Sequence, residues 1–147
     1  MHAIAFAVEF RGHSTPLQPG VVTARASAPS GALVTRIDSD GVHGTFEALE
    51  GGEALLECRL TFLDESSFDE VGTISFGAGN ALRFRSVGPG SLSRSPDPAL
   101  RQGTAAWDVD GGVGAFAGAC GRIVSNFLVS EGGDLTDRQL GVLFVDP

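Results

Sequence analysis

The chain repeats one turn three times, as Glu50-Gly51-Gly52-Glu53, Asp110-Gly111-Gly112-Val113 and Glu131-Gly132-Gly133-Asp134. Each glycine pair lies between segments in which apolar and polar residues alternate. Glycine readily adopts the positive φ angles of a tight hairpin turn, and alternation with a period of two is typical of strands. Three such turns predict an antiparallel meander of short strands.

The alternation continues away from these turns and is clearest near the start of the chain, in Ile4, Phe6, Val8 and Phe10. The one good helix start is Ser95-Pro96-Asp97-Pro98, which is enough for a single turn. A long meander leaves two open edges unless it closes or folds over itself. We therefore predict an all-β fold in one domain over residues 1–147, a barrel first and a sandwich second.

The composition excludes several classes of function. Eighteen acidic and ten basic residues give a net charge of −8, which argues against binding to nucleic-acid phosphates or to an anionic membrane surface. Lysine and tyrosine are absent, so a Schiff base and a tyrosine acid are excluded. No apolar run approaches the roughly 18 residues that span a bilayer, and the start lacks the basic segment of a secretion signal. A cytoplasmic location is expected.

Neither a metal nor a cofactor is predicted. Cys58 and Cys120 form no CxxC motif, and the three histidines share no metal-binding spacing. We expect the two cysteines to be free thiols, with a bridge between them as the alternative. The acidic run Asp64–Glu70 lacks the glycine of a calcium loop, and we interpret it as a solvated connection.

The turn positions determine which side chains share a face. With Gly51-Gly52 as a two-residue loop, Glu47 shares a face with Cys58, Leu60 and Phe62, and this face is the more apolar one. Directed inward, Glu47 becomes a carboxyl among apolar neighbours whose pKa should rise, which makes it a candidate acid catalyst. The alternative is a register slip of one residue, which would return Glu47 to solvent.

The hairpin at Gly132-Gly133 supplies the second catalytic candidate. It groups Ser125 and Phe127 with Arg138, whose guanidinium would then enter the lumen near one rim. There it could bind a carboxylate or enolate oxygen of a substrate. The alternative pairs Arg138 with an acid such as Glu131 on the surface.

The predicted interior is apolar, with few polar side chains. The turn at Gly111-Gly112 opposes Trp107 to Phe116 on it, and alternation directs Phe84 inward. The proline-containing segment Gly88–Gln102 is expected to cross one barrel mouth as a lid. The side chains that we expect to contact a substrate are Cys58, Leu60, Phe62, Phe84, Trp107, Phe116, Ser125 and Phe127.

The stretch Gly111-Gly112-Val113-Gly114-Ala115-Phe116-Ala117-Gly118-Ala119-Cys120-Gly121 is similar to the GG-x-G-x-F-x-G-A-x-G element of the allene oxide cyclase and dirigent proteins. Upstream, Gly44-Thr45-Phe46 resembles the strand that precedes this element. The resemblance implies a closed, eight-stranded, calycin-like antiparallel barrel with little helix and a small hydrophobic ligand. It also implies a homo-oligomer, dimer or trimer, in which barrels pack by their outer walls. The bacterial branch that cyclises natural products looks like the closer analogue.

These features favour a cofactor-independent cyclase or isomerase that acts on a polyketide- or oxylipin-like substrate. An apolar lumen would fold the substrate into its reactive conformer, with Glu47 and Arg138 stabilising the charge that develops. The alternatives are a non-catalytic binding or carrier barrel and a structural oligomer whose lumen is filled by its own side chains. A cavity of about 300 Å³ or more would exclude the last of these.

Overall fold

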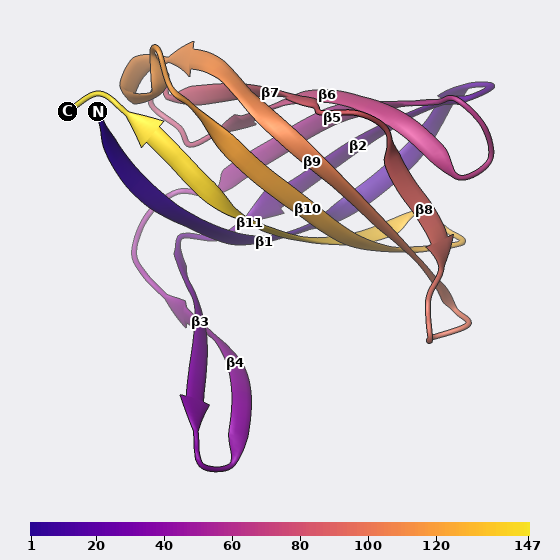
Figure 1. Cartoon of the computed structure of the whole chain (residues 1–147), viewed down its shortest axis with the longest axis horizontal. Coiled ribbons are helices and arrows are strands. Elements are labelled where there is room, and N and C mark those ends of the chain that lie inside the picture. The colour runs from indigo at the N-terminus through magenta and orange to yellow at the C-terminus, as the bar shows by residue number, and fades with distance from the viewer.

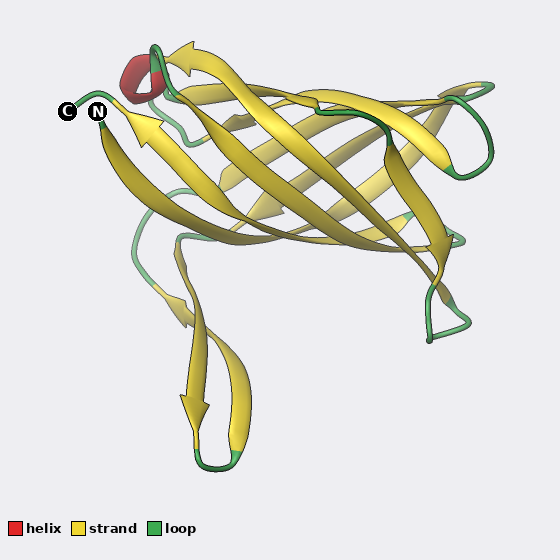
Figure 2. Ribbon diagram, in the orientation of Figure 1, coloured by secondary structure: helices red, strands yellow, loops and turns green.

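The computed structural model describes all residues 1–147, and about three quarters of the chain is β-strand (Figures 1 and 2). The only helical segment, η1, covers Gly114–Phe116, and no helix has the length and apolar character needed to cross a membrane. The strands are β1 (His2–Gln18), β2 (Val21–Ala28), β3 (Gly31–Asp38), β4 (Gly41–Ala48), β5 (Ala54–Phe62), β6 (Ser67–Ser75), β7 (Ala81–Ser86), β8 (Gly90–Arg94), β9 (Leu100–Val113), β10 (Cys120–Ser130) and β11 (Asp134–Val145).

Eight strand positions close into an antiparallel barrel. The order runs from β1 through β2, β5, β6, β7, β9 and β10 to β11, which pairs with β1 again. β7 and β8 share one position because both pair with β6 and β9. The non-strand residues Val87-Gly88-Pro89 separate these two strands. The predicted closed eight-stranded barrel is confirmed, and the sandwich alternative is wrong.

The inward face of the strands forms one apolar core. Its largest fully buried side chains include Trp107, Phe10 and Phe68. The indole of Trp107 stacks on the ring of Phe84, with 3.7 Å between the ring centroids. Alternation along each strand places these residues inside because side chains of a strand point to opposite faces in turn.

The three glycine pairs serve three different purposes. Gly132-Gly133 belongs to a three-residue loop between β10 and β11, in which Gly133 has a φ of +96°. Gly111-Gly112 lies within β9, where Gly111 has a φ of +75° and the pairing with β7 shifts, as at a β-bulge. Gly51-Gly52 links β4 to β5, and these two strands do not pair. The meander is correct although two of the three turns are not simple hairpins.

β3 and β4 form a separate two-stranded ribbon that projects from the barrel wall (Figure 1). The predicted lumen position of Glu47 is wrong, because β4 pairs with β3 rather than with β5. Glu47 is exposed on this ribbon, and its carboxylate accepts a hydrogen bond of 3.0 Å from Arg36.

The β10–β11 hairpin differs from the predicted register by one residue. Because its loop has three residues rather than two, Phe127 opposes Asp137 and not Arg138. Asp137 and Gln139 therefore face inward. The predicted lumen position of Arg138 is wrong: its Nε donates a hydrogen bond of 2.9 Å to Glu9 on the outer face.

Two further expectations are corrected by the pairing of β9. The residue opposite Trp107 is Ile123, whereas Phe116 lies on η1 and packs against Phe76, with 5.0 Å between ring centroids. Most of Gly88–Gln102 is strand rather than lid loop, since it contains β8 and the start of β9. No helical turn forms there; Asp97 instead closes the tight turn between the two strands.

Candidate functional site

A cavity of about 330 Å³ lies in the barrel lumen. It is near the end that carries the β1–β2, β5–β6 and β10–β11 turns, whereas both chain termini lie at the opposite end (Figure 1). Ten of the sixteen residues that line it are hydrophobic. The lumen is therefore not filled by its own side chains, and its volume lies in the range of small-molecule sites.

Two aromatic rings form part of the cavity wall. Phe62 and Phe127 line it, and the buried ring of Phe68 packs between them, at centroid distances of 5.5 Å and 6.0 Å. Of the side chains expected to contact a substrate, four line this cavity: Cys58, Leu60, Phe62 and Phe127.

The other four expected contacts do not line the cavity. Phe84 and Trp107 are packed against each other in the core. Ser125 is buried and donates a hydrogen bond to Asp137. Phe116 lies on η1, beside the chain termini.

Glu70 on β6 is the first of two buried acidic residues that line the cavity. Its side chain is buried, and its Oε1 accepts a hydrogen bond of 3.0 Å from the indole Nε1 of Trp107. Burial raises the pKa of Glu70 to about 7, because the charged form loses its hydration. The negative charge of Asp137 raises this pKa as well, whereas hydrogen bonds from Cys58 and Trp107 oppose the rise. Near neutral pH, Glu70 is thus present in both protonation states.

Asp137 on β11 is the second buried carboxyl of the cavity. Its oxygens accept hydrogen bonds of 2.7 Å from Ser125 Oγ and 2.8 Å from Gln139 Nε2. Burial raises the pKa of Asp137 even so. Gln139 is itself fully buried, and its Oε1 has no hydrogen-bond partner.

Cys58 is a poor nucleophile in this setting. Burial raises the pKa of its thiol, and the neighbouring Glu70 and Asp137 carboxylates raise it further. The reactive species of a cysteine is the thiolate, which is suppressed here. The neutral thiol of Cys58 instead acts as a hydrogen-bond donor to Glu70.

The cavity mouth carries the charged side chains of Arg101 from β9 and Glu131 from the β10–β11 loop. No group of three or more His, Cys, Asp or Glu residues is arranged to hold a metal ion. The buried carboxyls of Glu70 and Asp137 can donate and accept protons within apolar walls.

The sequence interpretation missed both carboxyls. Glu70 ends the acidic run that we interpreted as a solvated connection, yet it alternates in step with Phe68, Ile74 and Phe76. That shared parity was the available signal. Asp137 was missed because of the one-residue register error in its hairpin.

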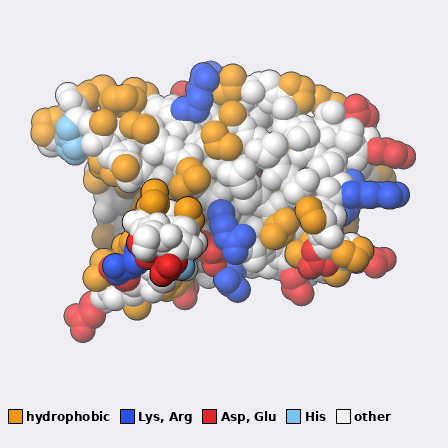
Figure 3. Space-filling view, turned by 60° about the horizontal axis from the view of Figure 1, so that its bottom comes forward, with side chains coloured by type: hydrophobic (Ala, Val, Ile, Leu, Met, Phe, Trp, Pro, Cys, Tyr) orange, Lys and Arg blue, Asp and Glu red, His pale blue; other side chains and the backbone are white.

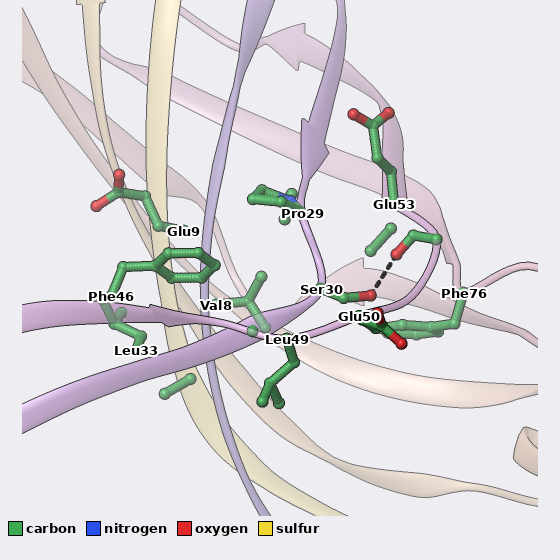
Figure 4. Close-up of a pocket in the computed structure, with 15 residues that line it drawn as sticks. Val8, Glu9, Pro29, Ser30, Leu33, Phe46, Leu49, Glu50, Glu53 and Phe76 are labelled. Atoms are coloured by element: carbon green, nitrogen blue, oxygen red, sulfur yellow. Dashed lines mark hydrogen bonds between the residues drawn. The ribbon is translucent and has the colours of Figure 1, made fainter.

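A second cavity, of about 350 Å³, lies between the β3–β4 ribbon and the barrel (Figure 4). Leu33 and Phe46 from the ribbon approach Val8 of β1, and Ser30 donates a hydrogen bond to the carbonyl of Gly52. Its titratable lining residues are Glu9, Glu50 and Glu53, and none of the three is buried. The lumen therefore remains the candidate site.

No protein-family model and no curated protein sequence matches the chain. Among solved structures, the fold is similar to that of the pterocarpan synthase dirigent protein GePTS1, with a TM-score of 0.52 and 16% sequence identity. The match covers 99% of this chain and 89% of that one. At this identity, the likeness concerns the fold.

Proposed function

We propose that this protein is a cofactor-independent cyclase or isomerase that holds a small hydrophobic substrate in the lumen and protonates it from Glu70. The observation that carries the proposal is a buried carboxyl with a pKa of about 7 on the wall of an apolar cavity. A general acid is most effective when its pKa is near the working pH. A dirigent protein named as a pterocarpan synthase has a similar fold, which supports a substrate of the natural-product kind.

The apolar walls supply confinement. Leu56 and Leu60 on β5, together with Phe62 and Phe127, would press a flexible polyketide- or oxylipin-like chain into a folded conformer. Because binding already holds the reacting atoms close together, the substrate loses this conformational entropy when it binds and not when it reacts, which lowers the barrier. The same walls exclude water, which would otherwise compete for a cationic intermediate.

Glu70 supplies the proton. The proton of its carboxyl O–H is transferred to a carbonyl, epoxide or alkene of the substrate, and the carbon left electron-poor accepts an electron pair from a π bond elsewhere in the same molecule. This forms the ring bond and leaves a cation at the other carbon of that π bond. The carboxylate then takes a proton from the carbon next to this cation, and a new double bond forms. Atoms and electrons balance without a cofactor. The Trp107 N–H stabilises the carboxylate while it is charged, and Asp137 helps to keep Glu70 protonated beforehand.

The test begins with the ligand. Protein purified from its native host is examined by native mass spectrometry, and any co-purified small molecule is identified. Wild type and Glu70→Gln are then incubated with that molecule and with a host metabolite extract, and products are followed by liquid chromatography and mass spectrometry. We expect Glu70→Gln to bind but not convert, whereas Glu47→Gln, the same change on the exposed ribbon, converts fully. Full conversion by Glu70→Gln would remove Glu70 from the mechanism.

One observation favours a carrier barrel as the second candidate. Glu70 already accepts the hydrogen bond that the buried Trp107 indole requires, so its carboxyl has a structural use without any chemistry. A carrier would release its ligand with an unchanged carbon skeleton in the same experiment, from wild type and Glu70→Gln alike.

A further inference from the structure

The first half of β1 has a free edge in the barrel wall. From His2 to Phe10, β1 pairs with β11 on one side and with no strand on the other, because its pairing with β2 begins only at Arg11. β2 ends at Ala28, where the chain leaves the barrel to form the β3–β4 ribbon. The base of the ribbon, rather than a paired strand, therefore lies beside this part of β1.

The free edge borders the second cavity, of about 350 Å³, which we call the ribbon cavity. Leu33 and Phe46 of the ribbon lie on one side of it and Phe76 of the barrel on the other (Figure 4). Phe46 and Leu49 are 47% and 66% exposed, so the chain leaves part of these apolar walls uncovered. Further apolar side chains gather beside the ribbon, at the end of the barrel that carries the termini (Figure 3). The volume lies in the range of small-molecule sites.

Short contacts fix the base of the ribbon and so preform the cavity. Ser30 Oγ donates a hydrogen bond to the carbonyl of Gly52, and the backbone N–H of Leu49 donates one of 3.1 Å to the carbonyl of Ser30. A Cβ at Gly31 would collide with the ring of Phe46, so this ring lies directly against the backbone of β3. A preformed cavity spares its ligand the entropy loss of ordering a mobile segment.

The ribbon cavity is acidic. Glu9, Glu50 and Glu53 line it, and none of its fifteen lining residues is basic. Glu9 is already neutralised, because it forms ion pairs of 2.8 Å with Arg11 and 2.9 Å with Arg138. Glu50 and Glu53 form no ion pair. Two carboxylates therefore line the cavity without a cation from the chain itself.

The free edge of β1 supplies a further hydrogen-bond acceptor. Successive residues of an antiparallel strand direct their backbone N–H and C=O groups to alternate sides. Ala7, Val8 and Glu9 are consecutive, and all three line the ribbon cavity. At least one of them therefore directs its carbonyl away from β11, toward the free edge. An ammonium group, with three N–H donors, can bind such a carbonyl and a carboxylate at the same time.

We propose that the ribbon cavity binds an organic cation, namely a protonated amine that carries an apolar group. Its ammonium would be held by Glu50, Glu53 and the free edge of β1, and its apolar part would cover Phe46 and Leu49. The ring of Phe46 can also attract the cation through its π electrons. This site is separate from the lumen and does not depend on the chemistry proposed there.

Other ligand classes fit the ribbon cavity less well. A neutral ligand would displace water from the two carboxylates without supplying a countercharge. An anion would be repelled by the same carboxylates and by the net charge of −8. A metal ion needs several converging ligands, and no group of three or more His, Cys, Asp or Glu residues is arranged to hold one.

The first test compares three naphthalene probes that differ in charge: 1-naphthylmethylamine, which is a cation at neutral pH, the neutral 1-naphthalenemethanol, and the anion 1-naphthylacetate. Methyl NMR of leucine-labelled protein reports where each probe binds, because Leu33 and Leu49 line the ribbon cavity and Leu60 lines the lumen. We expect the amine to shift the Leu33 and Leu49 signals with a dissociation constant about tenfold or more below that of the alcohol. The acetate should leave both signals unchanged.

The double variant Glu50→Gln/Glu53→Gln tests the carboxylates. It should weaken amine binding about tenfold, to the affinity of the alcohol. Glu65→Gln/Asp69→Asn is the matched control, because it removes the same charge from two exposed residues at the β5–β6 end of the barrel. The control should keep the wild-type affinity for the amine.

Phe46→Ala tests the apolar wall and should weaken amine binding severalfold, whereas Ile37→Ala, at the exposed ribbon tip, should not. Circular dichroism checks that each variant is folded. Wild type provides a test without any substitution: raising the salt from about 0.02 M to about 0.5 M should weaken binding of the amine, because exposed charges are screened.

Three results would overturn the proposal. The first is equal affinity of wild type for the amine and the alcohol, or for the amine and the acetate. The second is a set of amine-induced shifts confined to Leu60, which would place the cation in the lumen. The third is unchanged amine affinity in folded Glu50→Gln/Glu53→Gln.

Discussion

The indole Nε1 of Trp107 donates a hydrogen bond of 3.0 Å to Oε1 of Glu70 in the barrel interior. A buried indole N–H needs an acceptor, and a buried carboxyl needs a donor, so each group meets the requirement of the other. Phe84 stacks on the indole and holds its plane. The carboxyl is thereby fixed at the cavity wall.

Replacing Trp107 by Phe should cost about 1–3 kcal/mol of the free energy of unfolding, because a buried carboxyl loses a donor. It should also raise the pKa of Glu70 above about 7, since that bond favours the charged form. Urea unfolding followed by circular dichroism measures the first effect, and carboxyl NMR of labelled glutamate the second. Phe84→Leu is the control: it disturbs packing without moving the pKa of Glu70, and a shift of equal size there would contradict the role of the bond.

The free energy of unfolding should fall as pH rises from about 4.5 to about 7. Glu70 has an ordinary pKa of 4.5 when unfolded and about 7 when folded. The folded state therefore binds more protons in this window, so the contribution of Glu70 is full below pH 4.5 and lost as pH rises through 7. The loss is about 3 kcal/mol. Subtracting the Glu70→Gln profile isolates this term from Asp137, whose raised pKa acts in the same direction. A flat difference would show that Glu70 titrates normally.

Gly103→Ala should narrow the lumen. A Cβ at Gly103 would collide with the ring of Phe127, its cross-strand partner, and displace that ring toward the cavity. We expect a loss of about 1–3 kcal/mol in stability and weaker binding of the neutral fluorescent probe N-phenyl-1-naphthylamine. Gly52→Ala is the matched control, because a Cβ there meets nothing within 4 Å. Unchanged probe binding in Gly103→Ala would place the probe outside the lumen.

Arg138→Ala should leave probe binding in the lumen unchanged, because the guanidinium lies on the outer face. Partial burial disfavours the charged form of Glu9, but hydrogen bonds from Arg11 and Arg138 lower its pKa overall. Removing Arg138 should therefore raise the pKa of Glu9 and cost about 1 kcal/mol or less in chemical denaturation. A large loss of probe binding would return Arg138 to the site.

The closed barrel was predictable from the sequence because alternation assigns faces strand by strand. Ala105, Trp107 and Val109 fall on one inward face whatever turn follows them. Closure also does not depend on how each turn is built, so errors at Gly51-Gly52 and Gly111-Gly112 left the barrel correct.

The candidate site was not predictable to the same degree, because it depends on register. One extra loop residue exchanges Arg138 for Asp137 in the lumen, and both alternating sets of β11 are similarly apolar. Glu47 was misplaced because the sequence interpretation paired β4 with β5. The link at Gly51-Gly52 joins these two strands but forms no hairpin between them. Glu70 could have been found, because its parity with Phe68 and Ile74 is visible in the sequence itself.

Ala28 and Ala54 face each other as cross-strand partners of β2 and β5, so the chain leaves the barrel and re-enters it at the same point. The residues between them form an excursion that leaves the hydrogen-bonded pairing of β2 with β5 unbroken. This excursion can therefore change in length or sequence without altering the lumen chamber in which a substrate would be held.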